Sequence, residues 1–177
     1  MKNKRKAAFI DRDGTLIEEV NFLHRIEDLR YFSFTDEAVR MLKKNGFLVI
    51  VVTNQSGIGR GIYTEQEMHQ IHEQIQNDLT EKLDAFYFCP HLPDAGCACR
   101  KPNLGMIEAA CADFEIDLEN SWVIGDKNLD VLLGINAQIK SALVLTGYGQ
   151  NHLQILQQKP DVIAENLLEA VKIISEK

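Results

Sequence analysis

The sequence predicts an α/β protein in which a mostly parallel sheet is covered by helices on both faces. Short apolar, β-branched segments alternate along the chain with segments whose apolar residues recur at helical spacing. In addition, four segments of unusual chemistry, at residues 11–15, 53–61, 89–102 and 125–130, each follow an expected strand. Because parallel strands end at the same edge of a sheet, we expect these four segments to converge there.

The expected elements follow from the hydrophobic pattern, taken in chain order. They are a strand over 7–10, a mixed connection with a loop or flap over 16–34, a helix over 36–45, a strand over 47–52, a helix after the Gly-rich loop 56–61, a strand over 85–88, a helix over 104–114, a strand over 121–124, a helix to about 138, a strand over 142–145, and a tail in which a helix, the segment 161–164 and a final helix follow one another.

Local signals support two of the helices. Thr35 can cap the helix over 36–45, and Gly46 is well placed to end it. Thr64 and Glu67 have the spacing of a capping box, which predicts a helix start directly after Thr64.

Three chemically versatile side chains are interpreted as structural. His69 and His72 fit the exposed face of the helix that follows Thr64, so we expect both at the surface. Cys111 falls on the apolar side of the next expected helix with Ile107 and Ala110, and we expect a packed core thiol there.

The composition is that of an ordinary globular protein, with 45% hydrophobic and 25% charged residues. At 177 residues, we expect a single domain over 1–177. The net charge of −7 disfavours nucleic acid and anionic membranes as partners, and no apolar run reaches the ~20 residues of a membrane span. The basic run at 2–6 lacks the features of a secretory signal and reads as a solvated lead-in. Because the clustered cysteines favour metal binding over a disulfide framework, we expect a reducing, cytoplasmic compartment. We also expect a monomer.

Three cysteines and one histidine flank a single short loop: Cys89, His91, Cys97 and Cys99. Three thiolates and an imidazole form a closed tetrahedral Zn²⁺ site with no vacant position, which indicates a structural role. A labile disulfide or a redox centre is the alternative. A zinc ion here would fasten the loop that delivers Arg100 and Lys101.

Two carboxylates follow the first expected strand at close spacing. Asp11 would sit at the carboxyl end of that strand, and Asp13 follows with Gly14 allowing a tight turn. Carboxylates held this close repel each other unless a cation or a shared proton relieves them. The pattern indicates a Mg²⁺-assisted carboxylate nucleophile with an acid/base partner, and a solvated Asp-rich turn is the alternative.

The segments Asp11-Arg-Asp-Gly-Thr15 and Gly125-Asp-Lys-Asn-Leu-Asp130, with Thr53 and Lys101, resemble the haloacid dehalogenase (HAD) superfamily of phosphotransferases. The resemblance covers most of the chain, with the motifs in the expected order at expected strand ends. It implies a three-layer, Rossmann-like fold and a phosphatase whose Asp11 attacks phosphorus to form an aspartyl-phosphate. Asp13 would protonate the leaving oxygen and then activate water.

Mg²⁺ is the expected cofactor of this chemistry, held between Asp11, Asp13 and Asp126. The resemblance implies that a backbone carbonyl near Asp13 is also a ligand. We expect Asp130 to orient the site from behind the ligands or to cap a helix.

Three further residues have expected contacts with the phosphoryl group or the substrate. Thr53 would offer a hydroxyl and nearby N–H groups, although a β-branched strand end is the alternative reading. Lys101 would stabilise phosphate charge, and Lys127 could contact substrate; for each, an ordinary surface or helix-start lysine is the alternative.

The pattern Cys-Pro-His…Cys-x-Cys-Arg-Lys-Pro resembles a compact branch of the superfamily without a large cap domain. That branch includes heptose 1,7-bisphosphate 7-phosphatases and histidinol-phosphate phosphatases. Segments 53–61, 100–106 and 125–127 are similar to the heptose group, whereas the five residues between His91 and Cys97 make a short loop more typical of the histidinol group.

We therefore expect removal of the 7-phosphate of heptose bisphosphate, with histidinol phosphate as the alternative substrate. A zinc-stabilised phosphosugar-binding protein without catalysis is the alternative from another class. The expected substrate contacts are Glu19, Asn21, Phe22, Asn54, Gln55, Ser56, Arg60, Arg100 and Lys127, with Arg60 and Arg100 as candidates for a second phosphate.

Overall fold

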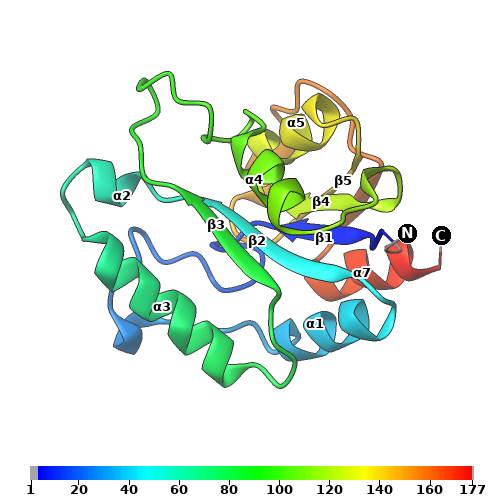
Figure 1. Ribbon diagram of the computed structural model, residues 1–177, viewed down its shortest axis with the longest axis horizontal. Coiled ribbons are helices and arrows are strands. Elements are labelled where there is room, and N and C mark those ends of the chain that lie inside the picture. The colour runs from blue at the N-terminus through cyan, green and yellow to red at the C-terminus, as the bar shows by residue number, and fades with distance from the viewer. Residues whose placement is uncertain (1–3, 177) are drawn as a thin grey trace.

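Six parallel strands form one sheet in the computed structural model, which describes residues 4–176 (Figure 1). The spatial order is β3-β2-β1-β4-β5-β6. The strands are β1 (Ala7–Ile10), β2 (Leu48–Asn54), β3 (Ala85–Cys89), β4 (Trp122–Gly125), β5 (Lys140–Val144) and β6 (Val162–Ala164). This order reverses direction between β1 and β4, which is where open α/β sheets bind ligands at their carboxyl edge.

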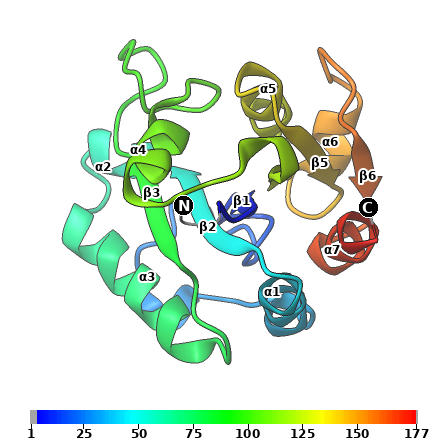
Figure 2. The ribbon, with the colours of Figure 1, turned by 45° about the vertical axis from the view of Figure 1, so that its right-hand side comes forward.

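Helices cover both faces of the sheet, which confirms the predicted three-layer arrangement (Figures 1 and 2). They are α1 (Thr35–Lys44), α2 (Ser56–Gly59), α3 (Glu65–Asp78), α4 (Gly105–Asp113), α5 (Asn128–Asn136), α6 (Gly149–Leu153) and α7 (Leu167–Ser175), with 3₁₀ turns η1 (Ile26–Asp28) and η2 (Leu118–Asn120). Helices α1, α3 and α7 lie on one face, and α4 and α5 on the other. No helix within residues 4–176 is long and apolar enough to cross a membrane.

The core is divided by the sheet into two apolar clusters. In β1, Ala8 and Ile10 contribute to the cluster under α1, α3 and α7, while Ala7 and Phe9 contribute to the cluster under α4 and α5. Both faces of this strand are buried, so its sequence is a continuous apolar run rather than an alternating one. The first polar residue after the run, Asp11, therefore marks the edge of the core.

The four chemically unusual segments meet at the carboxyl edge, as predicted. Asp11 directly follows β1, and its N–H donates to the carbonyl of Ile124 in β4 at 2.9 Å. Thr53 lies in β2 opposite Phe88 of β3, and β3 ends at Cys89. β4 ends at Gly125, so Asp126 emerges beside Asp11.

Helix α1 begins one residue earlier than predicted, and the proposed Thr35 cap is wrong. Phe34 is the N-cap, and Thr35 is the first helical residue, with its buried hydroxyl donating to the carbonyl of Leu16 at 2.8 Å. This bond fixes the connection between β1 and α1. The predicted helix end is confirmed, because Gly46 follows the C-cap with a φ of +81°, in the region that favours glycine.

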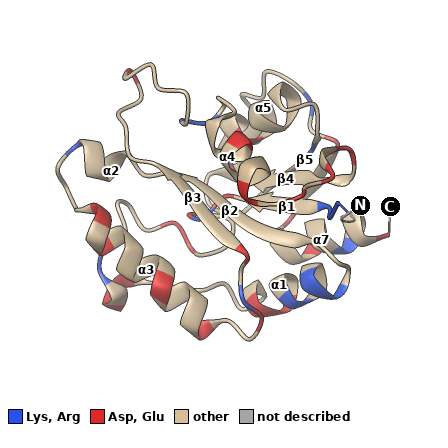
Figure 3. Cartoon of the chain, viewed as in Figure 1, with Lys and Arg blue, Asp and Glu red and all other residues tan. Residues whose placement is uncertain are grey.

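The ends of α1 carry opposite charges, visible in Figure 3. Two acidic residues lie in the first turn and two basic residues in the last turn. This distribution complements the helix dipole.

The basic run at 2–6 is described only from residue 4 onward; its first two residues lie outside the described residues. Lys4 and Arg5 are exposed, in line with a solvated lead-in. The backbone of Arg5 nevertheless bonds to Glu115 and Asp117, and the Lys6 ammonium lies 4.2 Å from the centre of the Phe47 ring.

The prediction that Cys111 is a core thiol is wrong, because its side chain is exposed. The buried side of α4 is formed by Met106, Ile107 and Ala110. Cys111 is one residue beyond Ala110, which turns it by 100° away from the sheet.

His72 is also a correction, because it is buried whereas His69 is exposed as predicted. The His72 ring stacks on Phe86 of β3 with 4.5 Å between ring centres. Its Nε2 lies 3.3 Å from Nη1 of Arg12. Burial, followed by the charge of Arg12, lowers the pKa of His72 to about 2.

This environment predicts a pH-dependent stability. The unfolded His72 gains a proton below pH ~6.5 and the folded one does not, so the free energy of unfolding falls by about 1.4 kcal/mol per pH unit as pH drops below that value. Urea unfolding of wild type and His72→Gln at pH 7 and pH 5 should show an extra loss of about 2 kcal/mol in wild type. His69→Gln is the matched control and should behave as wild type. Equal losses in wild type and His72→Gln would contradict the assignment.

Candidate active site and metal centre

A cavity of about 180 Å³ lies at the carboxyl edge of the sheet, between the flap after β1 and the loop after β2. Most of the predicted substrate contacts line it: Glu19, Asn21, Phe22, Asn54, Gln55, Ser56 and Lys127. Asp13 also lines it. The cavity is therefore bordered by an acidic residue, Asp13, from the segment after β1 and by a basic residue, Lys127, from the segment after β4.

Two predicted contacts do not line this cavity. Arg60 is exposed, with its guanidinium 6.0 Å from the centre of the Phe22 ring. Arg100 is half-buried and donates to the carbonyl of His91 at 3.3 Å.

Lys101 is buried between two carboxylates at the base of the site. Its Nζ lies 3.0 Å from Oδ1 of Asp11 and 2.6 Å from Oδ1 of Asp130, and all three side chains are at most 5% exposed. Burial alone would raise the pKa of Asp11, but Lys101 and Lys127 outweigh it and hold that pKa below its ordinary value. Asp11 is thus an ionised carboxylate at the end of β1.

The Asp126 carboxylate is fully buried and incompletely neutralised. Its Oδ2 accepts from the N–H of Tyr148 at 2.8 Å, whereas its Oδ1 accepts no hydrogen bond from any residue in the described part of the chain. The nearest cation to Oδ1 is the Lys127 ammonium, at 3.5 Å. Burial, followed by the charge of Asp11, raises the pKa of Asp126 to about 8.

A divalent cation fits this arrangement. The carboxylates of Asp11, Asp126 and Asp130 can each place one oxygen within 4.8 Å of the others. Oxygen ligands from carboxylates suit Mg²⁺, and its charge would stabilise the ionised form of Asp126. Two glycines keep this corner narrow, because a Cβ at Gly14 or Gly147 would lie 2.3 Å from Oδ2 of Asp126.

Asp130 has two neighbours that fix its carboxylate. One oxygen faces Lys101, and the other accepts from the backbone N–H of Lys127 at 3.0 Å. This second contact caps the start of α5, in agreement with the predicted capping role.

The Asp13 carboxylate is not one of the three grouped carboxylates and has its own partners. Both of its oxygens accept from Arg12, with Nε at 3.0 Å and Nη2 at 3.0 Å. Nε2 of Gln55 also donates to Asp13, at 2.9 Å, and to the hydroxyl of Thr53, at 2.8 Å. Asp13, Thr53 and Gln55 are therefore parts of one hydrogen-bonded group.

Sequence reasoning missed three residues at this group: Arg12, Tyr63 and His72. Arg12 is 1% exposed, and Tyr63 donates a hydrogen bond to Oε1 of Gln55. The position of Arg12 between two motif aspartates was the one available signal. Tyr148, which lines the cavity and lies under the Lys127 ammonium at 5.3 Å, gave no such signal.

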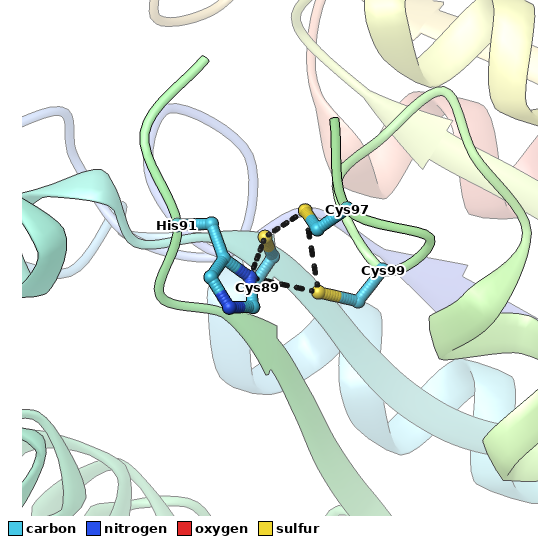
Figure 4. Close-up of side chains that lie close together, drawn as sticks. All are labelled: Cys89, His91, Cys97 and Cys99. Atoms are coloured by element: carbon cyan, nitrogen blue, oxygen red, sulfur yellow. Dashed lines mark hydrogen bonds between the residues drawn. The ribbon is translucent and has the colours of Figure 1, made fainter. Parts of the chain in front are cut away.

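The four predicted zinc ligands converge on one point (Figure 4). The Sγ atoms of Cys89 and Cys97 are 3.5 Å apart, those of Cys97 and Cys99 3.6 Å, and Nδ1 of His91 is 3.3 Å from Cys99 Sγ. A tetrahedron with Zn–S bonds of about 2.3 Å has edges of about 3.8 Å, so these spacings fit a zinc ion. They are too long for a disulfide bond.

Backbone contacts connect the cysteine cluster to the active site. The N–H of Gln55 donates to the carbonyl of Cys89 at 2.8 Å, and the N–H of Gly59 donates to Pro90 at 2.9 Å. The N–H of Lys101 donates to Oδ1 of Asn54 at 3.0 Å. The loop after β2 and the segment that carries Lys101 are therefore fixed relative to each other.

Comparisons with known proteins agree with the resemblance to HAD phosphotransferases. A family profile described as polynucleotide kinase 3 phosphatase matches residues 6–133, and one described as HAD-hydrolase-like matches residues 98–170. The chain is 39% identical to a D-glycero-alpha-D-manno-heptose-1,7-bisphosphate 7-phosphatase of Photorhabdus laumondii, with 97% of this chain and 98% of that protein covered. The chain belongs to the heptose-1,7-bisphosphate 7-phosphatase family. It is a phosphatase of the HAD type.

Two further members support the family assignment. D-glycero-D-manno-heptose-1,7-bisphosphate 7-phosphatase of Thermosynechococcus vestitus is 40% identical, with 96% of this chain and 95% of that protein covered. A crystal structure of D,D-heptose 1.7-bisphosphate phosphatase from B. bronchiseptica, complexed with magnesium and phosphate, has a TM-score of 0.89 and 27% identity, with 97% and 98% of the two chains covered. The family fold thus extends over nearly the whole chain.

The buried Lys101 leads to a stability prediction. Lys101→Met leaves Asp11 and Asp130 buried without their shared cation, which should lower the free energy of unfolding by about 3–5 kcal/mol. The measurement is urea unfolding without added Mg²⁺. Lys159→Met, at an exposed position, is the control and should change stability little. A loss below about 1 kcal/mol for Lys101→Met would show that the carboxylates are neutralised in another way.

Proposed function

We propose that the protein hydrolyses the C7 phosphate of D-glycero-D-manno-heptose 1,7-bisphosphate, in the synthesis of nucleotide-activated heptose for lipopolysaccharide core or a related glycan. The near full-length similarity to family members with this printed activity supports the substrate. The observation that carries the chemistry is the buried Asp11 carboxylate with the Lys101 ammonium 3.0 Å away.

Asp11 acts as the nucleophile in this proposal. Its Oδ1 accepts from the N–H of Arg12 at 2.8 Å and faces Lys101, whereas Oδ2 lies 3.6 Å from the Lys127 ammonium. A bond forms between a carboxylate oxygen of Asp11 and phosphorus as the bond from phosphorus to the C7 oxygen breaks, which gives an aspartyl-phosphate.

Asp13 moves the protons of both steps. For the first step one oxygen of Asp13 carries a proton while the other still accepts from Arg12. That proton passes to the departing C7 oxygen, and the resulting carboxylate then takes one from water. That water attacks the phosphorus, releases inorganic phosphate and restores Asp11. Lys101 and Thr53 contact the phosphoryl oxygens, where the ammonium stabilises the added negative charge.

Mg²⁺ would be held by Asp11, Asp126 and the backbone carbonyl of Asp13. When bound, it supplies the positive charge that lets one anion approach another. Asp130 is assigned to positioning rather than ligation, because its two oxygens already face Lys101 and the N–H of Lys127.

Zn²⁺ is proposed for the Cys89, His91, Cys97 and Cys99 cluster, in a structural role. Four protein ligands leave no position for substrate, so the ion would fix the loop that precedes Lys101. Arg60 and Arg100 are proposed to meet the second phosphate when substrate is bound. We further propose that the protein acts as a cytoplasmic monomer.

The substrate is tested by comparing kcat/KM for heptose 1,7-bisphosphate and histidinol phosphate with Mg²⁺ present. We expect a preference of at least about 100-fold for the heptose substrate, equivalent to about 2.7 kcal/mol of transition-state binding. A preference for histidinol phosphate would refute the proposed substrate while leaving the phosphatase chemistry intact.

Asp11→Asn tests the nucleophile, because the amide keeps the shape of the side chain but cannot form the acyl phosphate. We expect phosphate release to fall below detection while heptose bisphosphate still binds in calorimetry. Equal phosphate release by wild type and Asp11→Asn would refute the assignment. Binding with no phosphate release by wild type would instead identify a phosphosugar-binding protein.

The zinc proposal predicts about one zinc per chain in freshly purified protein, measured by elemental analysis. Cys97→Ser should lose most of the zinc and melt at a lower temperature, because it removes one of four ligands. Cys111→Ser removes an exposed thiol outside the cluster and is the matched control. Full zinc content in Cys97→Ser would contradict the four-ligand site.

A further inference from the structure

We propose that His72 is a positioning residue that holds the Arg12 guanidinium and, through it, the acid/base carboxylate of Asp13. The inference rests on the proposed role of Asp13. It concerns a residue on α3 that contacts Arg12, which does line the cavity. His72 itself neither lines the cavity nor belongs to a sequence motif.

Each of the three nitrogen atoms of the Arg12 guanidinium contacts a side chain. Nε and Nη2 donate to the two oxygens of Asp13, Nη2 also donates to Oε1 of Gln55 at 3.1 Å, and Nη1 faces Nε2 of His72 at 3.3 Å. Such a bidentate contact fixes both the position and the rotation of a carboxylate. Arg12 is 1% exposed, so water offers little compensation for a lost partner.

His72 must accept the Arg12 hydrogen bond, because a guanidinium has no acceptor atom. The imidazole is therefore neutral, with Nε2 carrying a lone pair and Nδ1 carrying the proton. Stacking on Phe86 holds the ring in the orientation that presents Nε2 to Arg12. The strongly lowered pKa of His72 agrees with this neutral form.

Gln55 holds the other side of Asp13, and its amide orientation is determined by its neighbours. Two donors, the Tyr63 hydroxyl and Arg12 Nη2, face Oε1. Two acceptors, Asp13 and Thr53, face Nε2. Asp13 is thus held between two side chains, of which only Arg12 contacts both of its oxygens.

Loss of the His72 acceptor would leave an N–H of a buried cation without a partner. The guanidinium would then rotate toward other acceptors, at the expense of its bidentate contact with Asp13. Proton transfer requires the acid within hydrogen-bond distance of the leaving oxygen, so it is the step most sensitive to this rotation. Attack by Asp11 does not depend on it.

The test uses two His72 variants and two substrates. His72→Phe keeps a ring to stack on Phe86 but has no acceptor, whereas His72→Gln can still accept from Arg12. Heptose bisphosphate needs a protonated leaving group, whereas p-nitrophenyl phosphate releases a phenolate that is stable without a proton. Because kcat/KM reports steps up to cleavage of the ester bond, the comparison isolates the acid step.

We expect His72→Phe to lower kcat/KM for heptose bisphosphate by about tenfold or more, and for p-nitrophenyl phosphate by less than about threefold. His72→Gln should stay within about threefold of wild type for both substrates. His69→Gln, one turn away on the exposed face of α3, is the matched control and should equal wild type. Circular dichroism and melting temperature confirm that each variant is folded.

An equal loss for both substrates in folded His72→Phe would overturn the proposal, as would no loss for either. Asp13→Asn separates this failure from failure of the proposed function. If Asp13→Asn selectively loses the heptose substrate while His72→Phe does not, the acid role of Asp13 stands and only the positioning role of His72 falls.

Discussion

The contact of the buried Lys101 ammonium with Asp11 and Asp130 is the interaction on which the rest of the site depends. Without this cation, two carboxylates would face each other away from solvent, and one of them would take up a proton. With it, Asp11 stays ionised at the end of β1, where it can act as a nucleophile. Asp126 differs from Asp11, because no cation fully balances the charge of its buried carboxylate. This carboxylate therefore favours a divalent cation.

Lys101 can hold this position only because several distant segments meet around it. Its Nζ donates to the carbonyl of Val52 at 2.9 Å, and its backbone N–H donates to Asn54. The cysteine cluster lies directly before it in sequence and is bonded to the loop after β2. The loop that carries the proposed zinc ligands thus places Lys101 at the sheet edge, where β2 holds it through Val52 and Asn54. On the opposite side, Arg12 and Gln55 hold Asp13 in a separate, hydrogen-bonded group.

Much of the fold was predictable because buried parallel strands are continuous apolar runs, and β1 and β4 are each followed directly by an aspartate. Asp11 and Asp126 could be placed for this reason, whereas the proposed zinc ligands were predicted from the close spacing of three cysteines and a histidine around one loop. His72 and Cys111 were misplaced because helical periodicity assigns a polar residue to solvent and an apolar one to the core. The periodicity says nothing of Arg12, which brings its own charge into the interior and needs a neutral acceptor there. Such pairwise requirements arise only once the elements are packed.

The most direct test of Asp11 as the nucleophile is to identify the residue that becomes covalently phosphorylated. In the Asp13→Asn variant, Asp11 should still attack the phosphorus of p-nitrophenyl phosphate, because p-nitrophenolate leaves without needing a proton. The amide at position 13 cannot activate water for the second step, so the aspartyl-phosphate should accumulate. Rapid mixing of this variant with p-nitrophenyl phosphate and Mg²⁺ should give a burst of about one p-nitrophenolate per chain. Mass spectrometry of the quenched protein should then place the phosphoryl group on Asp11. A phosphoryl group on any other residue, or steady turnover without a burst and without phosphorylated protein, would contradict the account.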